Sequence, residues 1–194
     1  MKLYYSPGAC SLATRIALHE AGIAAGFEKV DLRAKVTEHG DDYTAINPAG
    51  SVPMLVLEDG TAITENVAVL DLIAQHEPRL GLAGPLGRTR LIEMLSFLST
   101  ELHIAFKPFW HAASEADKAV ASKAVEKRLA LLESRMAGPY LFGPEFTVAD
   151  AYLFVMLRWA APFGVAIPPR LLDFFDRVLE LSTVRRALAE ERLA

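Results

Sequence analysis

The chain has 194 residues, of which 52% are hydrophobic, and it carries a formal net charge of −4 with a pI of about 5.7. This length can bury the core of one large domain or two small ones. The acidic balance argues against nucleic acid as a main partner, and no apolar run approaches the roughly 18 residues that cross a membrane. A single cysteine excludes an intramolecular disulfide and suits a reducing compartment such as the cytoplasm.

In residues 1–77, segments typical of strands alternate with segments typical of helices. Pro7-Gly8 interrupt the N-terminal stretch too early for it to be a signal peptide. The order is strand, helix, strand, then a hairpin and a final helix, which predicts a small sheet with helices packed on it. Residues 33–50 are expected to be irregular apart from one short helix. The predicted elements are strands at 2–5, 27–32, 54–57 and 62–64, and helices at 10–21, near 42–46 and from 65 onward.

Residues 78–87 hold three glycines and two prolines, which predicts a linker without regular structure. Beyond it the strand signals disappear. Leucines at helical spacing over 91–102 predict a long helix that Pro108 ends, and a second helix over 125–136 stops at Gly138-Pro139. A capping box at 147–150 predicts a third over 149–161, with shorter helices at 171–181 and 184–190. We therefore expect an α/β domain at 1–77 and an all-α helical bundle at 88–194.

Cys10, the only cysteine, stands where the first predicted strand gives way to the first helix. Backbone N–H groups and the helix dipole favour a thiolate there, so we expect the pKa of Cys10 to lie below about 8.5. The alternative is an inert cysteine packed as a small hydrophobe. Strand, turn, cysteine and helix form a thioredoxin-like arrangement, but Cys10-Ser11-Leu12-Ala13 lacks a resolving thiol. An activated Cys10 needs an outside thiol, and glutathione is the abundant cytoplasmic one.

Two further segments point to a binding site. Val52-Pro53 precedes a buried strand, where thioredoxin-like domains place a cis-proline that leaves the preceding backbone free to pair with a peptide-like ligand. Glu65-Asn66 stands where a strand enters a helix. Its carboxylate either makes only a favourable dipole contact or binds the α-amino group of a γ-glutamyl moiety.

His103 shares one face of the predicted long helix with Ser96, Ser99 and Thr100. A lone helical histidine is more often surface or core than catalytic, but beside a thiolate it can donate a hydrogen bond or shuttle a proton. We expect His103 to face Cys10 across the cleft between the domains. Five aromatic residues either line an apolar pocket or pack in the core: Phe106, Phe109, Trp110, Trp159 and Phe163.

Taken whole, the chain resembles a bacterial beta-class glutathione S-transferase. The segment 2–12, which holds Cys10, and the segment 100–103 are specific to that class. The segment 47–53 and the capping box at 147–150 are shared by transferases generally. The resemblance rests on residues 2–12, 40–43, 47–53, 59–61, 64–65, 99–103 and 146–154.

The resemblance implies a thioredoxin-like domain fused to a helical domain, a homodimer, glutathione as co-substrate, a small electrophile in the cleft and no metal. Cys10 and His103 would be catalytic, and Cys10 can form a mixed disulfide with glutathione. The glutathione-binding residues that it implies are Cys10, Lys35, Val52, Pro53, Glu65, Asn66, Ser96, Thr100 and His103.

By the same resemblance, Lys35 would meet the glycyl end of glutathione, and Val52 would pair through its backbone with the cysteinyl unit. Glu65 and Asn66 would hold the γ-glutamyl end. The helix from Ser96 onward would approach the same site, partly from the other subunit. The chain departs from the family pattern at Asn66, where a small residue is usual, and near Ser96, where an asparagine is usual.

Three functions remain open on the sequence. The first is conjugation, in which the glutathione thiolate attacks an electrophilic carbon. The second is thiol–disulfide exchange through a Cys10–glutathione mixed disulfide. The third is a non-catalytic dimeric ligand-binding or regulatory protein of the same fold, which we rank last because Cys10, Val52-Pro53, Glu65 and His103 are all present.

Overall fold

The computed structural model describes residues 1–111 and 114–193, so residue 194, the last of the predicted helical domain, lies outside the described residues. Its first part is a mixed sheet of order β3-β2-β1-β4-β5, in which only β1 and β2 run parallel. The register sets Leu3 opposite Phe27 and Leu55. The strands are β1 (Lys2–Tyr5), β2 (Gly26–Asp31), β3 (Val36–Thr37), β4 (Met54–Val56) and β5 (Ala62–Thr64).

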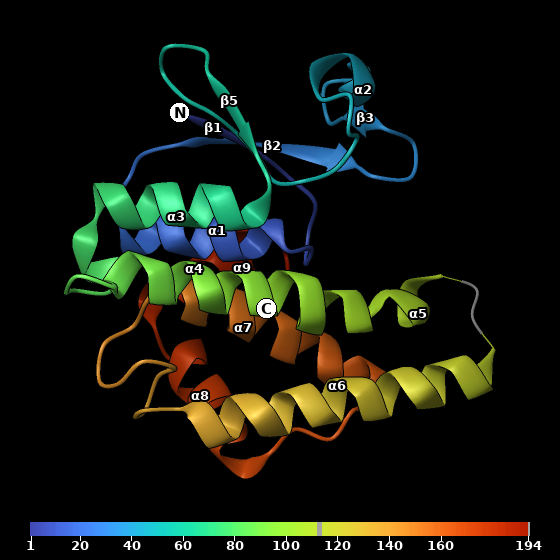
Figure 1. The fold of residues 1–194 in the computed structure, drawn as a ribbon. Coiled ribbons are helices and arrows are strands. Elements are labelled where there is room, and N and C mark those ends of the chain that lie inside the picture. The colour runs from blue at the N-terminus through green and yellow to red at the C-terminus, as the bar shows by residue number, and fades with distance from the viewer. Residues whose placement is uncertain (112–113, 194) are drawn as a thin grey trace.

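Helices cover the sheet on both faces. α1 (Ser11–Glu20) and α3 (Asn66–His76) lie side by side against one face, between the sheet and the later helices (Figure 1). Because side chains alternate along a strand, Leu3 joins the main core on that face while Tyr4 points to the other. There the Tyr4 ring packs against Tyr43 of α2 (Tyr43–Ile46), with ring centroids 5.6 Å apart.

The second part is helical in the residues that the structure describes, and it confirms the expected α/β domain followed by an all-α domain. α7 is buried along almost its whole length and packs against α1, which joins the two parts (Figure 1). The elements are η1 (Pro78–Leu80), α4 (Gly87–Phe97), η2 (Leu98–His103), α5 (Lys107–Trp110), α6 (Glu115–Arg135), α7 (Val148–Ala160), η3 (Ala161–Phe163), α8 (Pro169–Leu179) and α9 (Ser182–Glu190).

The predicted long helix differs from the observed one in a way that affects the site. After α4 the chain continues as the π-helix η2 instead of an α-helix. We predicted that Pro108 ends this helix, but it stands in the first turn of α5. The N–H that proline lacks would have no partner within the helix at that position, so no hydrogen bond is lost. A π-helical turn holds one residue more than an α-helical turn, so residues after it face a new direction.

Two smaller expectations were also wrong. The segment 33–50 holds a strand that we did not predict, β3, whose two residues pair with the end of β2 and are too few to show a periodicity. The linker 78–87 is not wholly irregular, because Pro78–Leu80 form a 3₁₀ turn with proline in its first turn.

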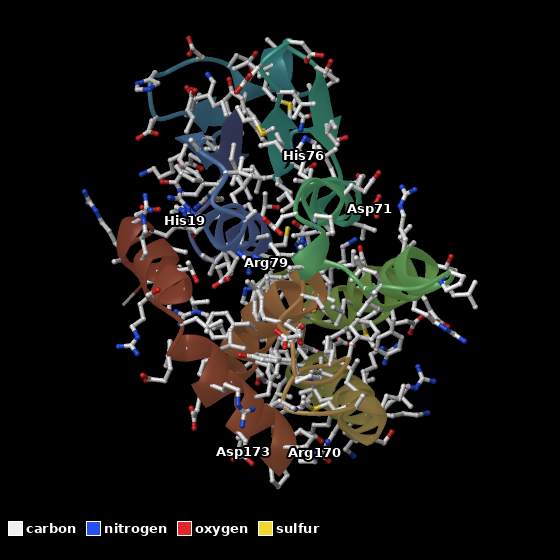
Figure 2. The ribbon with its side chains drawn as sticks, turned by 90° about the vertical axis from the view of Figure 1, so that its left-hand side faces the viewer. His19, Asp71, His76, Arg79, Arg170 and Asp173 are labelled. Atoms are coloured by element: carbon white, nitrogen blue, oxygen red, sulfur yellow. The ribbon has the colours of Figure 1, made fainter. Side chains whose placement is uncertain are left out.

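Charged side chains also join the two parts. Figure 2 shows His19 of α1 on the flank that faces α9, where its ring lies 2.8 Å from Glu190, and Asp71 of α3 on the opposite flank, paired with Arg88 of α4. The buried Arg15 of α1 binds both Glu190 and Glu191 at 2.8 and 3.0 Å. Among the described helices, none is both long enough and apolar enough to span a membrane.

Candidate active site

A cavity of about 630 Å³ opens where the first sheet meets the helical domain. Cys10 lines it from the start of α1, Val52 from the turn before β4, and His103 from the end of η2. The structure therefore brings Cys10 and His103 to one cavity, as the sequence predicted. The remaining lining residues are Pro7, Gly8, Ala9, Leu32, Lys35, Gly50, Ser51, Trp110, His111 and Trp159.

The Cys10 thiol differs from the expected thiolate. Burial raises the pKa of Cys10 to about 12, because desolvation outweighs the backbone N–H groups of Cys10 and Ser11 that favour the charged form. The thiol donates a hydrogen bond to the carbonyl oxygen of Val52, with Sγ and O 3.4 Å apart, which also holds the neutral form. The prediction of a lowered pKa was therefore wrong, since the helix terminus at Cys10 does not outweigh the loss of solvent.

The loops around Val52 and Lys35 form the part of the cavity wall next to Cys10. The Val52–Pro53 peptide bond is cis, as the sequence suggested. Lys35 adopts a left-handed backbone conformation with φ of 58°, and its ammonium donates to the carbonyl oxygen of Gly50 at 2.7 Å. A cation is thereby fixed at the cavity wall, where it can meet a carboxylate of a ligand.

Glu65 stands immediately before α3 with φ of 69°, a conformation that is strained for a residue other than glycine. Its side chain is exposed and lines a second, open hollow of about 390 Å³ together with Ser96 and Thr100. A carboxylate and the first N–H groups of an eleven-residue helix thus lie at one place. This hollow can take a group that carries both an ammonium and a carboxylate.

The residues that we expected on one face of this helix border two hollows. Ser96, Ser99 and Thr100 line the hollow at Glu65, whereas His103 lines the cavity at Cys10. Ser99 also lies near the phenol of Tyr152, which His103 contacts, so the polar stripe from Ser96 to His103 extends from one hollow to the other.

Asn66 does not reach either surface with its side chain. It is buried, and its Oδ1 accepts a hydrogen bond from Thr14 Oγ1 at 2.9 Å. Its Nδ2 is buried without a hydrogen-bond partner. Of the pair Glu65-Asn66, the structure presents the carboxylate of Glu65 to a ligand and turns the amide of Asn66 into the protein.

His103 is half-buried, and burial lowers its pKa to about 4, with the charge of Lys107 adding to the effect. The imidazole is therefore neutral at pH 7. Its Nδ1 lies 2.9 Å from the hydroxyl oxygen of Tyr152 in α7. Its ring also packs against Trp159, with centroids 4.8 Å apart.

The five aromatic candidates divide between pocket and core. Trp110 and Trp159 line the cavity and meet edge to face at 4.8 Å, whereas Phe106 is completely buried. Phe109 and Phe163 stack on each other at 4.5 Å without lining the cavity. Two indole rings thus form the apolar wall, which suits a flat or apolar group.

In the described residues, no cluster of His, Cys, Asp and Glu is arranged to hold a metal ion. The groups that the described residues bring to the two hollows are a thiol, an imidazole, a cation, a carboxylate and an apolar wall.

Comparisons with known proteins agree with this arrangement. Residues 8–76 match the family described as Glutathione S-transferase, N-terminal domain, and residues 97–182 match Glutathione S-transferase, C-terminal domain. Glutathione S-transferase GstA of Escherichia coli O157:H7 is 40% identical over 200 residues, which cover 100% of both chains. The chain belongs to the glutathione S-transferase family.

Solved structures of glutathione S-transferases extend the similarity to the whole fold. A sphingomonad glutathione S-transferase, solved in complex with glutathione, has a TM-score of 0.94 and 44% identity over 100% of both chains. A beta-class glutathione S-transferase of Sphingomonas chungbukensis, also 44% identical over 100% of both chains, has a TM-score of 0.91. The resemblance drawn from the sequence motifs is confirmed.

Sequence reasoning missed two contacts of this glutathione S-transferase site. Tyr152, which touches His103, appeared only as part of a shared motif. Gly8 is held at both backbone groups by the helical domain, since Glu191 accepts from its N–H at 2.9 Å and Trp159 donates to its carbonyl at 2.8 Å. Tyr152 and Trp159 are seven residues apart, two turns along α7, and this spacing is the signal that could have indicated a shared face.

Proposed function

We propose that this protein is a glutathione transferase that conjugates glutathione to small electrophiles, acting as a homodimer in the cytoplasm and serving in detoxification. One observation carries the proposal: a single cavity is lined by Cys10, Val52 and Lys35 of the first domain and by His103, Trp110 and Trp159 of the second. A thiol-bearing peptide and an apolar electrophile can meet there.

Each part of glutathione has a complementary group. The γ-glutamyl end, with an ammonium and a carboxylate, fits Glu65 and the N-terminus of α3, with Ser96 and Thr100 beside it. The backbone at Val52-Pro53 suits the cysteinyl unit, and Lys35 suits the glycyl carboxylate. In this placement the γ-glutamyl end lies in the hollow at Glu65 and the sulfur lies in the cavity beside Cys10.

In the proposed reaction the glutathione thiolate attacks an electrophilic carbon, an S–C bond forms, and the leaving group departs with its bonding electrons. Because burial raises the pKa of Cys10 to about 12, Cys10 takes part as a neutral thiol that donates a hydrogen bond to the glutathione sulfur. His103, neutral at pH 7, offers a second donor on the other wall.

Thiol–disulfide exchange is the second candidate, supported by the position of Cys10 on the cavity wall. Cys10 would attack the glutathionyl sulfur of a mixed disulfide, releasing the other thiol with the proton from Cys10. A second glutathione thiolate would then attack the Cys10–glutathione disulfide, giving oxidised glutathione and free Cys10. The neutral state of the Cys10 thiol slows its attack in this route.

Calorimetric titration with reduced glutathione, followed by conjugation of a chloronitrobenzene, tests the proposal on the purified protein. Saturable binding with an enzymatic rate supports a transferase. Activity only with a mixed-disulfide substrate would favour exchange. Binding without either activity would favour a ligand-binding or regulatory protein. Light scattering tests the homodimer, and a mass of one chain would contradict it.

A further inference from the structure

Tyr152 joins the site from α7 without reaching the cavity surface. Its side chain is 1% exposed, and its hydroxyl oxygen lies 2.9 Å from Nδ1 of His103. The two rings meet edge to face, with centroids 6.2 Å apart. A buried phenol and a ring that lines the cavity are thus joined by one hydrogen bond.

The direction of that bond follows from the surroundings of the phenol. Burial raises the pKa of Tyr152 well above its usual value, so the hydroxyl keeps its proton at any working pH. Ser99 and Asn66 bring donor groups near the phenol oxygen, and they oppose part of that rise. The Nδ2 of Asn66 is buried and makes no direct hydrogen bond. Because donor groups lie near the phenol oxygen, the hydroxyl proton of Tyr152 is left to donate to Nδ1 of His103.

A neutral imidazole has one donor nitrogen and one acceptor nitrogen. His103 is neutral above about pH 4 because it is partly buried beside Lys107. If Nδ1 accepts the proton of Tyr152, then Nε2 must carry the ring hydrogen. Nε2 is also the nitrogen that Tyr152 leaves unoccupied, so it is the one that can meet a ligand in the cavity with Cys10.

We propose that Tyr152 is a positioning residue that fixes His103 as the Nε2–H tautomer, making the imidazole a hydrogen-bond donor toward the glutathione sulfur. The inference rests on the proposed function for its ligand, but the tautomer is a property of the free protein. His103 in this arrangement stabilises a thiolate and cannot act as the base that removes the thiol proton, because its only basic nitrogen is occupied.

Nitrogen-15 NMR of the histidine side chains tests the proposal on the full-length protein without glutathione at pH 7. A His103→Ala variant identifies the His103 signals. We expect an unprotonated Nδ1 and a protonated Nε2 in the wild type, and a mixture of tautomers in Tyr152→Phe. Tyr140→Phe is the matched control, because this phenol lies in the helical domain and its ring packs only against Phe146 and Phe174 among the aromatic contacts described.

The kinetic expectation is a fall in kcat of about 3- to 10-fold in Tyr152→Phe, the range that one neutral hydrogen bond supports, with KM for glutathione changed less than about twofold. A wild-type His103 protonated on Nδ1, or an unchanged tautomer in Tyr152→Phe, would overturn the proposal. The wild-type spectrum decides even if the variant does not fold. A protein with the expected tautomer but without glutathione binding would contradict the proposed function and leave the assignment of Tyr152 intact.

Discussion

The thiol of Cys10 and the carbonyl oxygen of Val52 are joined by a hydrogen bond, with Sγ and O 3.4 Å apart. The bond crosses from the N-cap of α1 to the loop that holds the cis peptide bond at Pro53. It uses the proton that Cys10 would have to lose to become a nucleophile. Burial acts in the same direction on the pKa of the thiol. The free protein thus holds its only cysteine in the unreactive form.

Alkylation of the free protein should therefore be slow at neutral pH. Because burial raises the pKa of Cys10 to about 12, the thiolate fraction stays small up to pH 9 and rises steeply only above about pH 10. Iodoacetamide rates across a pH series check this, with free glutathione as the reference thiol. A half-maximal rate below about pH 7.5 would show that the helix terminus dominates after all.

Removing the thiol should separate the two candidate reactions. Cys10→Ala takes away one donor to the glutathione sulfur, so we expect conjugation to fall by about 3- to 10-fold, as for a single hydrogen bond. Exchange with a mixed-disulfide substrate should be lost, since it needs the sulfur itself. Steady-state rates with both substrates give the comparison. Equal losses in the two assays would mean that Cys10 serves the fold or the binding site instead.

Glu65→Gln should weaken glutathione binding much more than folding. A carboxylate that answers an ammonium makes a charge-assisted bond, and its loss raises Kd by roughly 10- to 100-fold. Glu58→Gln, an exposed carboxylate in the turn after β4, is the matched control. Titration calorimetry measures the affinity and thermal melting measures the stability. An unchanged Kd with a lower melting temperature would mean that Glu65 only stabilises the N-terminus of α3 through the helix dipole.

The protonation of His103 should be visible in tryptophan fluorescence. The chain has two tryptophans, and both indole rings contact the imidazole, with centroids 5.7 and 4.8 Å away. Because the pKa of His103 is lowered to about 4, the emission should stay constant from about pH 8 to 5.5 and be quenched only below about pH 5. A His103→Ala variant should lack this change. A transition near pH 6.5 in the wild type would show an imidazole in contact with solvent.

The same lowered pKa predicts how stability depends on pH. The unfolded chain protonates His103 near pH 6.5 and the folded chain near pH 4, so the unfolded state binds more protons between these values. The free energy of unfolding should fall as the pH drops through that window. Denaturant titrations of the wild type and of His103→Ala check it, and the variant should show a shallower fall. If the free energy of unfolding depends on pH in the same way in both proteins, the lowered pKa does not belong to His103.

The capping box of α7 should matter far more than that of α6. Asp150 is fully buried and accepts hydrogen bonds from Leu141 N, Thr147 N and Thr147 Oγ1 at 2.7–2.8 Å. Asp150→Ala should lower the free energy of unfolding by about 2–4 kcal/mol. Asp117→Ala removes the equivalent carboxylate from the exposed box at Ser114 and should have a much smaller effect. Equal losses of unfolding free energy in the two variants would show that burial does not determine how much a capping box stabilises its helix.

The sequence predicted the elements that depend on local pattern. The short apolar run of β1, the capping box of α7 and the positions of Cys10 and His103 could all be read from the sequence. The direction of the pKa shift at Cys10 could not, because it depends on how many atoms from distant segments surround the thiol. The π-helical turn at Leu98–His103 has no signal in the leucine spacing, since Leu98 and Leu102 are buried as an α-helix would also predict.

The contacts that hold the site together are also long-range. Tyr152 meets His103 across 49 residues, and Glu191 meets Gly8 across 183, so neither pair follows from local periodicity. The inward turn of the Asn66 amide likewise depends on Thr14 of another helix.

The decisive experiment is a crystal structure of the protein with reduced glutathione. We expect the glutathione sulfur in the cavity within hydrogen-bond reach of Cys10 Sγ, with Nε2 of His103 directed toward it. We also expect the γ-glutamyl end at Glu65 and the glycyl carboxylate at Lys35. Glutathione bound elsewhere, or bound with its sulfur directed away from both Cys10 and His103, would contradict this placement.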